Sequence, residues 1–132
     1  MSDKQHTLTN FDEKLTELAD KMVEMGAAVR VSVELAGKAL VHADEDILKA
    51  VRKNDDVINA FDEEIQQKAT ETIALMNPMA VDLRFVTSAL RISVALERAG
   101  DITKAITKRM VCLLYTSPSP RDQRGSRMPS SA

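Results

Sequence analysis

The sequence predicts an all-α protein, an antiparallel three-helix bundle that forms one domain. Apolar residues recur every three or four positions over most of residues 9–111, which is the spacing of one face of an α-helix. Aromatic residues make up only 3% of the 132-residue chain and tryptophan is absent, so a β-sandwich is disfavoured. The long stretches rich in Ala, Leu, Glu and Lys consist of strong helix formers.

Composition narrows the class of protein further. The net charge of −2 argues against a general nucleic-acid binder. A single cysteine excludes a disulfide framework and fits a reducing compartment. The N-terminal segment has no apolar core of the kind found in signal peptides, and no apolar run is long enough to span a membrane. We therefore expect a cytoplasmic protein without a nucleic-acid partner.

The first helix is expected over residues 9–42. Thr9 or Asn10 can cap its N-terminus, and two acidic residues follow in the first turn, where they complement the helix dipole. Residues 1–8 are expected to be disordered. The apolar stripe of this helix consists of Phe11, Leu15, Leu18, Met22, Met25, Val29, Val33, Ala36 and Leu40.

Pro78 divides the remaining periodic segment into two helices. The second helix is expected to begin near Asp44 and to end at Asn77, because proline disfavours helical backbone in the residue before it. The third helix should begin at Met79 or Ala80. The apolar stripe of the second helix consists of Ile47, Val51, Ile58, Phe61, Ile65, Ala69, Thr72 or Ile73, and Met76.

The third helix, which should end near Val111, carries two apolar stripes. A helix with two apolar faces contacts two neighbours, as in a three-helix bundle. Because the connections are short, successive helices should be antiparallel. One stripe consists of Leu83, Val86, Leu90 and Val94, and the other of Phe85, Ala89, Ile92, Leu96 and Ala99.

Two acids of the third helix lie in line with its first apolar stripe. Glu97 and Asp101 are one helical turn apart, so their carboxylates can face the same point. The second helix offers Asp55, Asn59 and Asp62, which lie on one edge of its apolar stripe. A cluster of oxygen donors from two neighbouring helices suits a hard or borderline cation such as Mg²⁺, Mn²⁺ or Fe. These five residues are the candidate metal ligands.

A plainer interpretation of the acids stays open. Acids spaced four residues apart are common on solvated helix faces, and Arg98, Lys104 and Lys108 are near enough to pair with Glu97 or Asp101. A partner's basic groups could also meet them, which would make the protein a metal-free helical interaction module.

Catalysis is not expected. The sequence contains no E-x-x-H pair of the di-iron type and no Gly-rich phosphate loop, so a carboxylate-bridged metalloenzyme is disfavoured. His6 lies in the N-terminal segment that is expected to be disordered, and His42 lies at the end of the predicted first helix. Gly100, in contrast, lies between Glu97 and Asp101 in the middle of the predicted third helix. Glycine at such a position costs about 1 kcal/mol relative to alanine, and it is best tolerated where another group approaches the backbone closely.

The third predicted helix resembles that of the PhoU family of phosphate-signalling proteins. The family pattern there is a proline, a small residue, D-L-R, an apolar run and L-E-R-x-G-D, and the segments "DDVINAFDEEI" and "FDEKLTELADKMVEMGAAV" resemble the family's second and first helices. The resemblance covers about residues 10–110. The matching residues of the third helix are Pro78, Ala80, Asp82, Leu83, Arg84, Leu96, Glu97, Arg98, Gly100 and Asp101.

The resemblance implies a function as well as a fold. Members of this family consist of two such bundles, bind metal through their acidic motifs, and are not known as enzymes. They act in the cytoplasm as negative regulators of phosphate uptake and of the phosphate-starvation two-component response. Their partners are the ATPase of a phosphate ABC transporter and a sensor histidine kinase, and a homodimer is expected for the full-length form. The resemblance implies that Asp55, Asn59, Glu97 and Asp101 bind the metal, which would be Fe, Mn, Mg or Zn. Asp62 would be a further ligand by a weaker match to the family's motif.

The last segment, residues 112–132, differs in composition from the rest of the chain. It carries a net charge of +2, against −4 for residues 1–111, and holds three of the four prolines. DNA that encodes "CLLYTSPSPRD" and "SRMPSSA" resembles the two ends of a transposase adapter used in sequencing libraries. We therefore expect this segment to be an unstructured, artefactual tail, and residues 9–111 to be the N-terminal half of a longer protein.

Overall fold

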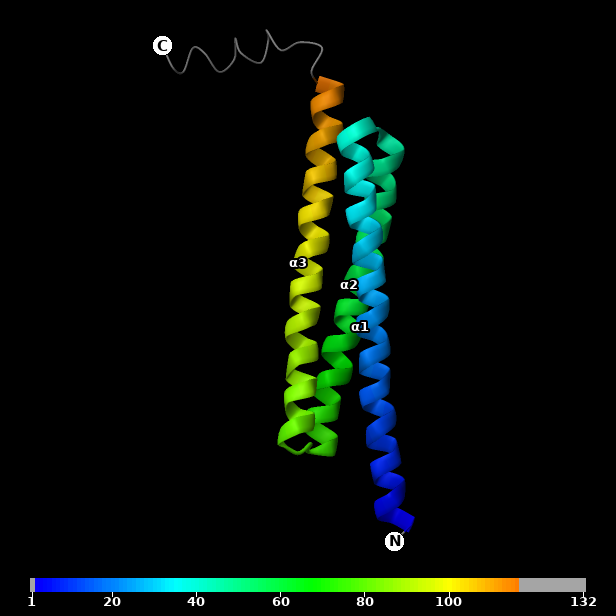
Figure 1. The fold of residues 1–132 in the computed structure, drawn as a ribbon, viewed down its shortest axis with the longest axis vertical. Helices are drawn as coiled ribbons and strands as arrows, with labels where there is room; N and C mark the ends of the chain where they lie inside the picture. Colours follow the sequence, from blue (N-terminus) through cyan, green and yellow to red (C-terminus); the bar gives the residue numbers. More distant parts are fainter. Residues whose placement is uncertain (1, 117–132) are drawn as a thin grey trace, which may run out of the picture.

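The computed structural model describes the backbone of residues 2–116 and the side chains of residues 10–114. It contains three α-helices, α1 (Ser2–His42), α2 (Glu45–Met76) and α3 (Ala80–Thr116), and no strand in the described part of the chain. Each helix packs against both others. Helices α1 and α3 run in the same direction and α2 runs antiparallel to both (Figure 1). The predicted all-α three-helix bundle is confirmed.

The connections between helices have the caps that the sequence favours. The carboxylate of Asp44 accepts a hydrogen bond from the Ile47 amide at 2.8 Å and so caps α2. Helix α2 ends at Met76, and its C-cap Asn77 adopts the left-handed conformation with φ of 46°, a conformation that asparagine tolerates better than most residues. The Met79 carbonyl then accepts from the Leu83 amide at 2.7 Å, which starts α3.

Two predicted boundaries were wrong. Helix α1 begins at Ser2, so residues 2–8, which were expected to be disordered, continue the helix backwards from Asn10. Helix α3 continues through Thr116, so residues 112–116 of the expected unstructured tail are helical. An N-terminal capping residue permits a helix start without enforcing one. The rest of the expected tail, residues 117–132, lies outside the described residues.

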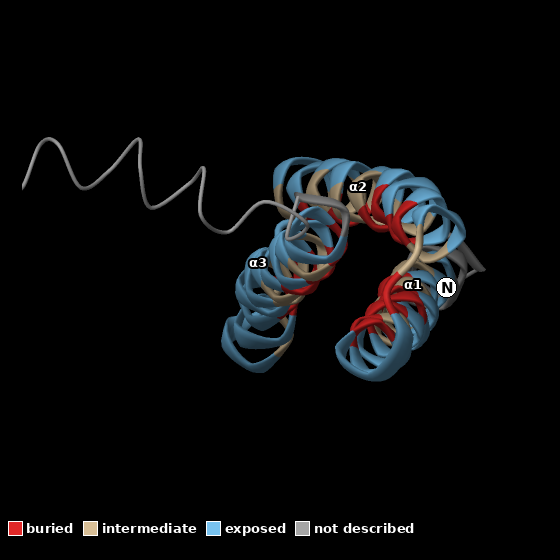
Figure 2. Ribbon diagram, turned by 90° about the horizontal axis from the view of Figure 1, so that it is seen from above, coloured by how far each residue is buried: buried red, intermediate tan, exposed pale blue. Residues whose placement is uncertain are grey.

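The core follows most of the predicted stripes of α1 and α2. Val33 and Leu40 of α1 were expected in the core but are 53% and 61% exposed, because the second half of α1 turns Ser32, Ala36 and Ala39 inward instead. Buried residues line the sides of the helices that face one another (Figure 2). The main cluster lies in the middle of the bundle and a smaller one, built around Ala39, Ala43, Leu48 and Val111, lies near the α1–α2 connection. The main cluster consists of Leu18, Met25, Ala28, Val29, Ile58, Ile65, Ala69, Val86 and Ala89.

Helix α3 turns inward a line that takes Val86 from one predicted stripe and Ala89 from the other. Leu83 and Phe85, which were expected in the core, are 38% and 37% exposed. Val94 is 49% exposed and Ile92 is 41% exposed, although both were expected in the core. The buried line runs between the two stripes and is made largely of small or short polar residues, which allow α3 to approach both neighbours closely. This line consists of Val86, Ala89, Ser93, Gly100, Thr103, Thr107 and Val111.

Over residues 2–116, no helix has an apolar stretch long enough to cross a bilayer.

Candidate functional site

The interface between α2 and α3 carries the predicted acids. Successive turns of α2 present Asp55, Asn59 and Asp62, while α3 presents Glu97 and Asp101 on either side of Gly100. A Cβ at Gly100 would lie 3.0 Å from Cδ1 of Ile58, so the two helices approach closely at this glycine. The close approach that the sequence predicted at Gly100 is therefore confirmed.

Asp55 is the most buried of the five residues, with 3% of its surface exposed. Its Oδ2 lies 2.8 Å from the Lys104 ammonium and accepts a longer bond of 3.5 Å from the Asn59 amide. Its Oδ1 is buried and has no hydrogen-bond partner in the structure. Burying a carboxylate oxygen without a partner is costly, so Asp55 is incompletely satisfied.

Asp62 is half-buried and is held by neutral donors. Its Oδ1 accepts a hydrogen bond of 2.6 Å from the Ser93 hydroxyl across the α2–α3 interface and one of 3.4 Å from Gln66. The hydroxyl of Ser93 also lies 3.6 Å from the Met25 sulfur of α1. Ser93 therefore joins the acidic face to the core of the bundle.

Glu97 is half-buried, whereas Asp101 is exposed. Burial raises the pKa of the Glu97 carboxyl above its usual value, and the negative charges of Asp101, Asp62 and Asp55 raise it further. The hydrogen bond to Asp55 raises the pKa of Lys104, although burial opposes this rise. Asp101, Asp62 and Asp55 are therefore close enough to Glu97 for their negative charges to act on it.

A hollow of about 490 Å³ lies over this cluster between α2 and α3. Its walls carry three carboxylates and three cationic side chains, so its polar character fits ions better than an apolar ligand. The lining side chains are Arg52, Asp55, Asp56, Asp101, Lys104 and Lys108, with Ala105 beside them.

The candidate ligands carry the kind of donor atom that a metal cation prefers, but their side chains do not converge on one point in the structure. Both helices carry oxygen donors at this interface, and one buried oxygen of Asp55 has no partner, a combination of donors that suits a hard cation. However, no three Asp, Glu, His or Cys side chains in the described part of the chain converge tightly enough to hold an ion. The Lys104 ammonium instead takes the place of a cation on Asp55. The assignment of the five residues to a metal remains a prediction.

Sequence reasoning missed two participants in this site. Ser93 was not identified, although it lies four residues before Glu97 and therefore on the same face of α3. Lys104 was recognised as a possible partner, but for the acids of its own helix, whereas it contacts Asp55 of α2. The spacing within one helix indicates which residues share a face, but not which residue of the neighbouring helix lies opposite.

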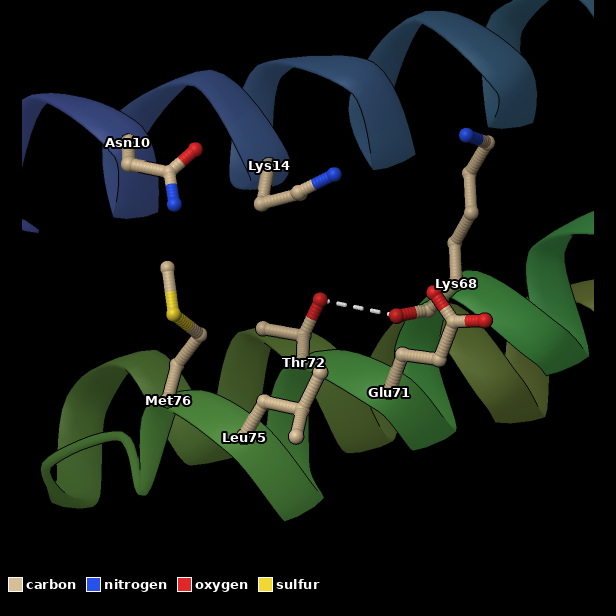
Figure 3. A pocket seen from close by; sticks show the side chains of 7 residues that line it. All are labelled: Asn10, Lys14, Lys68, Glu71, Thr72, Leu75 and Met76. Atoms are coloured by element: carbon tan, nitrogen blue, oxygen red, sulfur yellow. Dashed lines mark hydrogen bonds between the residues drawn. The ribbon is translucent and has the colours of Figure 1, made fainter.

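A second hollow, of about 200 Å³, lies between the N-terminal part of α1 and the C-terminal part of α2 (Figure 3). Two of its polar residues have partners: Thr72 donates to the Lys68 carbonyl at 2.7 Å, and the Lys68 ammonium lies 3.3 Å from Glu17. Leu75 and Met76 form its apolar wall. The hollow contains no cluster of like charges, and we assign it no role.

The family can be identified by comparison with known proteins. Residues 22–110 match the model of the PhoU domain family. No solved structure matches the chain.

Curated relatives agree with this match. A "Phosphate-specific transport system accessory protein PhoU homolog" of Caulobacter vibrioides (strain NA1000) is 37% identical over 114 residues, which are 86% of this chain and 50% of the relative. A relative of the same name in Rhizobium meliloti is 35% identical over 82% of this chain and 46% of its own length. The one in Pseudomonas aeruginosa is 31% identical over 88% of this chain and 48% of its own length.

The chain spans about half the length of the curated relatives that it matches. The three helices, the acids on α2 and α3 and the similarity over most of the chain agree with the resemblance seen in the sequence alone. The chain therefore belongs to the PhoU domain family.

Proposed function

We propose that the chain is a regulatory accessory protein of a phosphate transport system. The observation that supports this role is family membership, since the matched relatives are named as accessory proteins of a phosphate-specific transport system. Because the chain spans about half of those relatives, the role is proposed for the bundle as part of the regulator.

The proposed mode of action is negative regulation by contact. The bundle would restrain phosphate uptake and phosphate-starvation two-component signalling in the cytoplasm, through the ATPase of a phosphate ABC transporter and a sensor histidine kinase. The full-length form would be a homodimer. We assign the chain no catalytic role, because its acids lack the E-x-x-H partner of carboxylate-bridged metalloenzymes.

Metal binding is the second part of the proposal. A divalent cation (Fe, Mn, Mg or Zn) would be held at the α2–α3 interface by Asp55, Asn59, Asp62, Glu97 and Asp101. Burial raises the pKa of Glu97, and repulsion by the neighbouring carboxylates raises it further. This repulsion supports the assignment because a cation would relieve it. The unpartnered oxygen of Asp55 supports it as well.

One observation favours a second candidate, the metal-free interaction module. Lys104 already neutralises part of the cluster through its 2.8 Å contact with Asp55. In this case the acids would stabilise the α2–α3 interface, and the exposed Asp101 would meet basic groups of a partner protein.

Two assays test the transport role. Purified chain is titrated against the ATPase subunit of a phosphate ABC transporter, and phosphate uptake is measured in bacteria that lack their own PhoU protein, with and without this chain. We expect saturable binding and lower uptake at high phosphate. Absence of both effects would overturn the proposed role.

The metal assignment is tested by the metal content of the purified chain. We expect one or more equivalents of a divalent metal in the natural sequence and a large loss in the Glu97→Ala/Asp101→Ala variant. Equal metal in the two proteins would overturn the site, and metal in neither would favour the metal-free module.

A further inference from the structure

The position of Lys104 carries an inference that rests on the proposed metal-binding function. We infer that Lys104 is a tethered cation that occupies the metal's place on Asp55, so that a divalent cation enters the α2–α3 interface only by displacing its ammonium group. Lys104 would thus set the affinity of the site for metal without being a ligand.

The contact between Lys104 and Asp55 differs from every other ion pair in the described chain. The Asp55 side chain is 5% exposed, whereas the carboxylate side chain is 37–59% exposed in the other pairs. The distance of 2.8 Å is also the shortest among them. A buried carboxylate needs a cation far more than an exposed one does, because water cannot replace the missing partner.

The ammonium group satisfies only one of the two Asp55 oxygens. Oδ2 contacts Lys104, while Oδ1 is buried without a partner and would lie 3.7 Å from a Cβ built on Gly100. The oxygen that Lys104 leaves unsatisfied points to the same gap between the helices where Gly100 has no side chain. Asp55 therefore keeps an unmet demand for positive charge.

The cations around the hollow differ in what they contact. Three carboxylates and three cationic side chains line it, but of Arg52, Lys104 and Lys108 only Lys104 forms an ion pair with a carboxylate of the described residues. Lys104 is therefore the cation that a metal ion would have to displace from Asp55. A divalent cation would bring two positive charges to this carboxylate where the ammonium brings one.

The two partners also differ in how easily they can leave. The Lys104 side chain is 40% exposed and has a flexible four-carbon stem, so its ammonium can turn to water once another cation takes its place on Asp55. Asp55, in contrast, is fixed in the interface by burial. The carboxylate is therefore the constant part of the site, and the lysine is the part that can move.

The experiment is a titration of the full chain with MnCl₂, followed by calorimetry and by the electron paramagnetic resonance of free Mn²⁺. Three proteins are compared after removal of metal: the natural sequence, Lys104→Met and Lys108→Met. Lys108 lines the same hollow, one turn further along α3, so its variant controls for the loss of one positive charge. In parallel, acetylation of Lys104 is measured by mass spectrometry with and without Mn²⁺, which tests displacement in the natural sequence.

We expect Lys104→Met to bind Mn²⁺ at least about tenfold more tightly than the natural sequence, and Lys108→Met to change the affinity less than about threefold. Acetylation of Lys104 should rise when Mn²⁺ is added. If Lys104→Met does not fold, Lys104→Gln takes its place.

The outcomes separate this inference from the function on which it rests. Equal Mn²⁺ affinity in the natural sequence and Lys104→Met, with unchanged acetylation, would overturn the role of Lys104 but leave the metal site standing. An equal gain in Lys104→Met and Lys108→Met would reduce the effect to general charge and also overturn it. Absence of Mn²⁺ binding in all three proteins would overturn the proposed metal site itself.

Discussion

The α1–α2 and α2–α3 interfaces use the same kinds of polar side chain, but they differ in whether the buried polar atoms have hydrogen-bond partners. Across α1–α2, Asn54 donates to the Ala28 carbonyl at 2.6 Å and to the Ser32 hydroxyl at 2.7 Å. The charged pairs at this interface, such as Lys68 with Glu17, lie at the exposed rim. Across α2–α3, a carboxylate oxygen of Asp55 is buried without a partner.

The difference separates polar groups that stabilise the bundle from polar groups that are held ready for a ligand. At α1–α2, opposite or neutral partners meet, and little would be gained by adding an ion. At α2–α3, several carboxylates gather, and burial together with the charges of the neighbouring acids raises the pKa of Glu97. Stability alone does not favour such an arrangement, so a functional role for the acids is the simpler explanation.

The largest expected effect concerns the packing of the two interfaces. We expect Gly100→Leu to lower the free energy of unfolding by about 2–3 kcal/mol, because even a Cβ there would lie 3.0 Å from Cδ1 of Ile58. The control is Gly26→Leu in α1, where a Cβ would meet no neighbouring side chain within 4 Å and the better helix former should be neutral or stabilising by up to about 1 kcal/mol. Urea denaturation measures both, and equal effects would contradict the close approach at Gly100.

A second prediction compares one lysine at each interface in metal-free protein. We expect Lys104→Met to lower the free energy of unfolding by about 1–3 kcal/mol, because Asp55 would then keep a buried charge without its cation. Lys68→Met should cost no more than about 1 kcal/mol, because Glu17 is exposed to water. Thermal denaturation in a chelator measures the difference. A larger loss in Lys68→Met would reverse the comparison.

A third prediction tests whether α1–α2 is held by its neutral hydrogen bonds. We expect Asn54→Ala to lower the free energy of unfolding by about 1–2 kcal/mol, because the buried hydroxyl of Ser32 loses its donor. The Asn54→Ala/Ser32→Ala double variant should cost less than the sum of the two single changes, as expected for residues in contact. Additive effects in denaturant titrations would show that the two side chains act independently.

Periodicity and proline were enough to predict the bundle, but not which line of α3 faces inward. Each stripe of α1 and α2 was dominated by large apolar residues, and most of these are buried or half-buried. On α3 the largest apolar residues flank the buried line, and Ala89, Ser93 and Gly100 occupy its centre. Hydropathy gives such small residues little weight, although close helix packing requires them.

The candidate site shows a similar limit. The helical repeat placed Glu97 with Asp101 and Asp55 with Asp62, and the structure brings the two pairs to one interface. The repeat could not reveal that Lys104 faces Asp55, because that contact joins residues 49 positions apart in sequence and depends on the relative rotation and height of two helices. Such long-range partners were decided by packing.

The smallest expected effect is a dependence on pH that belongs to the α2–α3 interface alone. The raised pKa of Glu97 means that the folded state holds this proton more tightly than the unfolded state does. Stability is therefore lost as the pH rises from about the ordinary value of 4.5 through the raised value. Glu97→Gln removes this loss and should stabilise the metal-free protein by about 0.2–0.5 kcal/mol at pH 7. The gain should vanish near pH 4, where both states of the natural protein bind the proton. Denaturation from pH 4 to 8 in a chelator checks the sign, with Glu63→Gln on the exposed side of α2 as the control. A destabilised Glu97→Gln at pH 7 would show that Glu97 has a favourable partner in the metal-free protein, and the two interfaces would then no longer differ in kind.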